Sequence, residues 1–106
     1  MGRKQSQIEE YKYQLVKNEC HAYLHRRKII KDGKADEGVI FAAITLNDHF
    51  EKAVAFLESR EVEEFTHDIV EGKGWCRSRL FECMCINTYV SHKQQFIKAL
   101  SQMLGE

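Results

Sequence analysis

The apolar residues of this chain recur at the period of an α-helix in two long N-terminal blocks. Between residues 6 and 31, one helical face is apolar and Lys and His side chains lie opposite it; the residues of the apolar face are Ile8, Tyr11, Leu15, Ala22 and Ile29, flanked by Val16, Tyr23 and Ile30. Gly33 ends this block, and Asp36 is a residue type suited to the N-cap of the next. The stripe of the second block is Val39, Ala43, Leu46, Phe50, Ala53, Val54 and Leu57. Two amphipathic helices are predicted.

Two further blocks follow the same period. Residues 61 to 71 place Val62, Phe65 and Ile69 on one side, and Gly72 ends the block. The last block, residues 75 to 104, has a clear apolar stripe in its second half and a less regular first half, and we interpret all of it as helix. Because none of these helices buries its stripe alone, they must pack together. We predict a single all-α domain over residues 1–106, a small antiparallel bundle of three to four helices.

Composition and charge support a small helical domain and exclude several classes of protein. The 106 residues include no proline, which favours uninterrupted helices. Sixteen Lys and Arg balance sixteen Asp and Glu, so no net charge attracts the chain to nucleic acid or to an anionic membrane. The longest apolar run, residues 39 to 44, is too short to span a membrane, and the polar N-terminus is unlike a signal peptide. We therefore expect a cytoplasmic protein without a membrane partner.

Histidines and cysteines are the obvious metal ligands to consider. His21 and His25 have the i, i+4 spacing that lets two imidazoles face one ion, but Cys20 points about 100° away from His21 on a helix. Nearby lysines also oppose a cation. We expect no metal and no cofactor. The other cysteines, expected to be buried free thiols, are Cys76, Cys83 and Cys85.

Arg60 and His67 form a candidate catalytic pair. An Arg followed by a His at this spacing resembles the R-x4–6-H motif of the HEPN family of small all-helical ribonucleases. The resemblance implies that His67 acts in acid-base catalysis and that Arg60 stabilises phosphate charge. Glu61 departs from the polar Asn, Asp or His that the family prefers after the arginine. A HEPN-like ribonuclease is therefore an alternative function, and the competing interpretation is a charged, solvated helix face.

A basic run at residues 25–34 is a second candidate site. Its cations are Arg26, Arg27, Lys28, Lys31 and Lys34. Their position at the end of a helix favours them electrostatically without any ligand. Arg77 and Arg79 form a second small cluster, and if the two clusters lay together they would suit a phosphate. A nucleic-acid or nucleotide binder is thus a further alternative function.

A short local similarity involves residues 80 to 86, which read L-F-E-x-x-C-I. This segment is similar to a stretch of the Gam inhibitors of a bacterial recombination nuclease, which are made by lambda-type phages. Proteins that mimic DNA are pronouncedly acidic, whereas this chain has no net charge. The similarity therefore transfers no functional residues.

Phe41 and Phe56 lie on nearly the opposite side of their predicted helix from its main stripe. A surface helix keeps that side polar, so we expect both rings to be covered, either by another helix of the bundle or by a second chain. Without a convincing catalytic set, the sequence favours a non-enzymatic protein-interaction module, such as a small regulator or inhibitor. Its partner is another protein, or itself as a homodimer.

Overall fold

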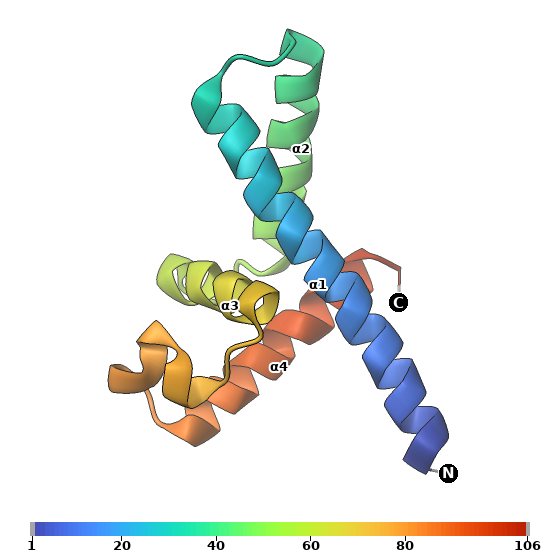
Figure 1. Cartoon of the computed structure of the whole chain (residues 1–106), viewed down its shortest axis with the longest axis vertical. Helices are drawn as coiled ribbons and strands as arrows, with labels where there is room; N and C mark the ends of the chain where they lie inside the picture. Colours follow the sequence, from blue (N-terminus) through green and yellow to red (C-terminus); the bar gives the residue numbers. More distant parts are fainter. Residues whose placement is uncertain (1, 106) are drawn as a thin grey trace.

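The described part of the chain, residues 2–105, folds into an all-α bundle of four helices. The computed structural model describes residues 2–105, with the side chains of residues 10–105. The helices are α1 (Gly2–Asp32), α2 (Glu37–Ala53), α3 (Ser59–Glu71) and α4 (Ile86–Met103), and two 3₁₀ turns, η1 (Trp75–Arg77) and η2 (Arg79–Glu82), link α3 to α4. Helices α1 and α2 form an antiparallel hairpin, while α3 and α4 pack across its lower part (Figure 1). The predicted all-α bundle is confirmed.

Two glycines end helices as the sequence predicts. Gly33 has φ +64°, and its N–H donates to the carbonyl of Ile29 at 3.1 Å. Gly72, with φ +68°, caps α3 in the left-handed conformation. Glycine adopts this conformation without the steric cost that a Cβ imposes. These ends set the turn that folds α2 back on α1 and the turn that leads into η1.

A continuous series of aromatic rings forms the core and joins all four helices. Tyr23 of α1 stacks on Phe50 of α2, with ring centroids 4.1 Å apart. Phe50 then contacts Phe96 of α4 at 6.2 Å, and Phe96 contacts Phe65 of α3 at 5.8 Å. Phe65 packs edge-on against Tyr89 at 5.4 Å. The hairpin and the α3–α4 pair therefore share one core.

The buried faces of α1 and α2 are rotated from those that the sequence predicts. In α1 the buried stripe is Val16, Cys20 and Tyr23, so two predicted flanking residues are in the core, whereas Tyr11 is exposed. Ile8 lies outside the residues whose side chains the structure describes. In α2 the buried residues are Ala43, Asn47 and Phe50, followed by Val54 just beyond the helix.

The polar residue Asn47 explains the rotation of α2. Its amide donates to the backbone carbonyl of Tyr23 at 3.3 Å and accepts a hydrogen bond from Arg26 Nε at 2.5 Å. These bonds hold the Asn47 side of α2 against α1. Val39 and Leu46, placed in the core by the periodicity, are therefore left 48% and 52% exposed.

The prediction of helix over residues 75 to 85 is wrong. This segment forms η1 and η2, and α4 begins only at Ile86. The Trp75 indole donates to the carbonyl of Met84 at 2.9 Å, and the Ser78 hydroxyl accepts from Leu80 N at 3.1 Å. Side-chain bonds of this kind compete with a continuous helical ladder. The resulting turns cover one side of α3 and α4.

Candidate functional site

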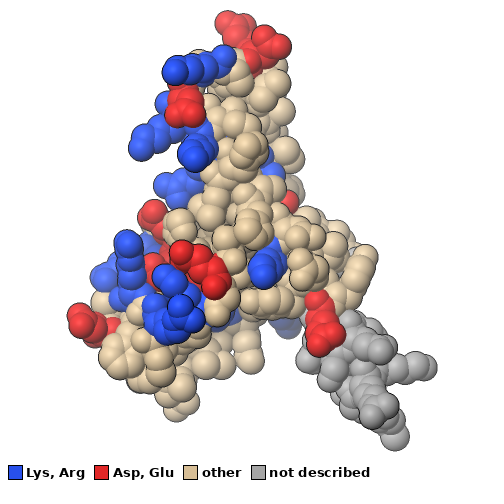
Figure 2. Space-filling view, viewed as in Figure 1, with Lys and Arg blue, Asp and Glu red and all other residues tan. Residues whose placement is uncertain are grey.

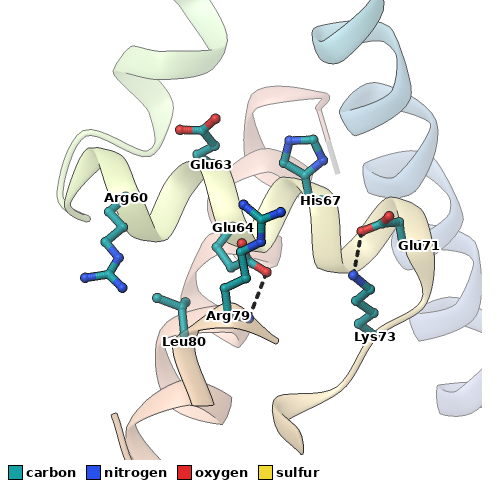
Figure 3. A pocket seen from close by; sticks show the side chains of 8 residues that line it. All are labelled: Arg60, Glu63, Glu64, His67, Glu71, Lys73, Arg79 and Leu80. Atoms are coloured by element: carbon teal, nitrogen blue, oxygen red, sulfur yellow. Dashed lines mark hydrogen bonds and ion pairs between the residues drawn. The ribbon is translucent and has the colours of Figure 1, made fainter. Parts of the chain in front are cut away.

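An open cleft of about 530 Å³ lies between α3 and the 3₁₀ turns (Figure 3). Basic and acidic side chains both line it, and its lining residues are Arg60, Glu63, Glu64, His67, Glu71, Lys73, Arg79 and Leu80. Lys73 pairs with Glu71 at 3.2 Å, and Glu64 accepts a hydrogen bond from the backbone N–H of Arg79 at 3.2 Å. The cations of the cleft are thus interleaved with carboxylates, which oppose the binding of a polyanion.

The structure brings Arg60 and His67 to the same cleft without directing them at a common point. Both side chains line the cleft, but they extend in different directions (Figure 3). Arg60 Nη2 lies 2.9 Å from Cys83 Sγ, so its guanidinium is turned toward the segment before α4. A general acid-base pair must reach the same reacting group. This geometry gives the HEPN-like alternative little support.

A carboxyl pair, Glu64 and Asp68, lies beneath the cleft, one helical turn apart on α3. Asp68 is fully buried, and its Oδ2 accepts a hydrogen bond from Tyr89 at 2.8 Å. Its Oδ1 has no hydrogen-bond partner among the described residues, and a proton on Glu64 would supply one. Burial, and next the hydrogen bond shared with Asp68, raise the pKa of Glu64. The folded protein therefore binds a proton at Glu64 more tightly than the unfolded chain does.

Replacing Glu64 by Gln is expected to stabilise the protein increasingly as the pH rises. For a carboxyl with a raised pKa, the stabilising contribution is fully present below the pKa of the unfolded chain, about 4.3, and is lost as the pH rises through the higher folded value. The Gln variant cannot lose that proton. Thermal melts at pH 4 and pH 7 should show the Tm difference, variant minus wild type, widening toward pH 7. A constant difference would contradict the assignment.

The predicted anion-binding residues do not form a continuous cationic surface. Arg26 is largely buried and forms an ion pair with Glu19, and Arg27 lies 3.7 Å from Glu63. Lys28, Lys31, Lys34, Arg77 and Arg79 are exposed. Figure 2 shows Lys and Arg along one side of the molecule, with Asp and Glu between them. A broad nucleic-acid interface therefore gains little support.

The aromatic pair proposed for partner binding is uncovered. Phe41 is 72% exposed and Phe56 is 56% exposed, so the described part of the chain buries neither ring. Around Phe41, every residue from 39 to 46 except Thr45 is apolar. Apolar residues on all sides of a helix indicate that it packs against more than the core of its own chain. Our sequence interpretation, which placed Val39 and Leu46 in the core, missed this signal.

The apolar half of α2 lies at the free end of the hairpin. Residues 26–46, here called the hairpin tip, extend beyond α3 and α4 (Figure 1). A groove of about 360 Å³ between α1 and α2 lies there, with Ile30, Ile44 and Asn47 among its lining residues. Charged side chains also line it: Arg27, Lys31, Asp48 and Glu51. The groove therefore combines two isoleucines and the buried amide of Asn47 with charged side chains. Apolar residues surrounded by polar ones are typical of protein interfaces.

Comparisons with known proteins leave the function to be inferred from these surfaces. No protein-family model, curated protein or solved structure matches this chain. The geometry and charge of the hairpin tip and of the cleft beside α3 are therefore the basis for a function.

The cysteines and histidines do not gather into a metal centre in the part of the chain that the structure describes. No group of three or more His, Cys, Asp or Glu side chains there could hold an ion. All four cysteines are free: Cys20 is buried, and burial raises its pKa to about 12. Cys76, Cys83 and Cys85 are exposed, which corrects the prediction that they are buried. Within residues 2–105, no helix is both long enough and apolar enough to cross a membrane.

Proposed function

We propose that this protein is a non-enzymatic protein-interaction module that binds another protein, as its regulator or inhibitor, through the hairpin tip. One observation carries the proposal: Phe41 projects from the middle of an apolar helix segment and is 72% exposed. Exposed apolar patches rimmed by polar residues mark interaction sites on soluble proteins. In the cleft beside α3, carboxylates neutralise the cations, and this gives a catalytic function no comparable support.

The proposed contact joins Phe41 to the groove between α1 and α2. Ile44 lies three residues after Phe41, is 48% exposed and lines that groove. Residues at this spacing are neighbours on a helix surface. Lys31 from α1 and Asp48 from α2 line the groove with opposite charges, which suits a partner with complementary charges around an apolar anchor. Aromatic residues at the centre of such a patch dominate binding energy.

Site-specific photocrosslinking tests the proposal. A photoreactive phenylalanine analogue at position 41 should give a discrete adduct with one protein in the native host, and the same analogue at the exposed position of Gln14, outside the hairpin tip, should not. Once the partner is purified, Phe41→Ala should weaken its binding at least tenfold, because truncating a central aromatic anchor costs about 2 kcal/mol or more. Identical adducts from both positions, or unchanged affinity, would overturn the proposal.

A further inference from the structure

A second exposed stripe on α2 has the spacing of a coiled-coil seam. Its residues are Val39, Ala42, Leu46, His49 and Ala53, separated by steps of 3, 4, 3 and 4. Phe56, at the next step of 3, lies just past the end of the helix. Alternating steps of three and four place side chains in one line along a helix that packs against another. None of these residues is Asp, Glu, Lys or Arg.

This stripe, the α2 seam, is uncovered in the single chain. Val39 and Leu46 are each about half exposed, Ala42 and His49 are exposed, and Ala53 is half-buried. At 100° per residue, the seam lies about a third of a turn around α2 from Phe41. It is therefore a different face from the one that the proposed function uses, and inferences about the two faces can fail separately.

The seam is complementary to itself when two copies run antiparallel. With the two-fold axis between positions 47 and 48, Leu46 faces His49 of the other copy, and Ala42 faces Ala53. Val39 then faces Phe56 at each end. The small alanines let the backbones approach, and the larger residues fill the layers on either side of them. No like charges oppose each other along the seam, and the net charge of zero produces no long-range repulsion between copies.

We infer that a second copy of this chain docks antiparallel on the α2 seam and forms a weak two-fold dimer. Val39, Leu46 and Phe56 are each about half exposed. A half-exposed side chain of this size has on the order of 100 Å² of accessible surface that a second copy can bury. Three of them give roughly 300 Å² per copy, so even with their surroundings the interface lies at the low end of specific interfaces. The dimer is consequently weak and reversible.

Sedimentation equilibrium of the full chain from about 5 to 500 µM tests the dimer. The average mass of the wild type should rise toward twice the monomer mass, whereas Leu46→Lys should stay monomeric throughout. The matched control Ile44→Lys alters an equally exposed aliphatic residue on another side of α2 and should dimerise as the wild type does. A wild type that stays monomeric at 500 µM, or a control that loses dimerisation as Leu46→Lys does, would overturn the inference.

Disulfide trapping tests the orientation independently of those variants. In a chain with Cys76, Cys83 and Cys85 changed to Ser, the Ala42→Cys and Ala53→Cys proteins are mixed in equal amounts and oxidised. An antiparallel seam gives mainly the mixed disulfide, because position 42 faces position 53. Predominant homodisulfides at position 42 would indicate parallel helices and refute the proposed arrangement. Photocrosslinking from position 41 in Leu46→Lys reports separately on the proposed function.

Discussion

Replacing Phe50 by Ala is expected to lower the free energy of unfolding by about 3–5 kcal/mol. Phe50 is fully buried, and its ring links Tyr23 of α1 to Phe96 of α4. The substitution removes apolar burial and leaves a cavity where the hairpin meets the rest of the bundle. Since domains of this size are stable by about 5–15 kcal/mol, a large part of the total would be lost.

Phe41→Ala provides the matched control for this prediction. It makes the same chemical change on the same helix, but the ring is 72% exposed and its removal leaves no cavity. Urea unfolding followed by circular dichroism should show a shift of no more than about 0.5 kcal/mol for Phe41→Ala. Equal losses in the two variants would mean that Phe41 is also covered in solution at the protein concentration used. Repeating the measurement at several concentrations then reveals whether a second chain covers it.

The approximate positions of the four helices in the described part of the chain, and the C-terminal ends of α1 and α3, were predictable from local sequence, because each depends on neighbouring residues, whereas the start of α4 was not. Gly33 and Gly72 end helices through their own backbone freedom, and the helical period identified the blocks between them. Which face of α2 is buried depends instead on Asn47, whose partners belong to α1. An analysis of apolar periodicity assigns polar residues to the solvent side of a helix. It therefore placed Leu46 in the core, where the structure has Asn47. Tertiary hydrogen bonds decided the rotation.

In the candidate site, too, local spacing was predictable from the sequence and tertiary contacts were not. Helical spacing predicted that Arg60 and His67 share a face, and both line one cleft. The direction of Arg60 depends on Cys83, which lies in a segment that was itself predicted as helix. For Phe41, the sequence left open whether the ring lies in the core or at an interface. Its exposure excludes the core of the single chain, because only tertiary packing decides which of the two apolar sides of α2 is covered.

Replacing Tyr89 by Phe should destabilise the protein by about 1–3 kcal/mol although it deletes a single oxygen. The Tyr89 hydroxyl donates to Asp68 Oδ2 at 2.8 Å and accepts from Lys93 Nζ at 3.2 Å. Lys93 also donates to the carbonyl of Lys73 at 2.9 Å, which ties α4 to the end of α3. Asp68 is fully buried, so the loss leaves a desolvated carboxyl without the hydroxyl donor.

Tyr11→Phe is the control for this last prediction, because Tyr11 is 58% exposed and water can replace its hydroxyl contacts. Its unfolding free energy should stay within about 0.5 kcal/mol of the wild type. If Tyr89→Phe is no more costly than Tyr11→Phe, Asp68 must regain a donor by other means, and Glu64 is the adjacent source of a proton. If Tyr89→Phe is costly as expected, the double variant Tyr89→Phe with Glu64→Gln should recover part of the lost stability at pH 7, because the amide of Gln can donate to Asp68. Lack of any recovery would show that Glu64 does not share a hydrogen bond with Asp68.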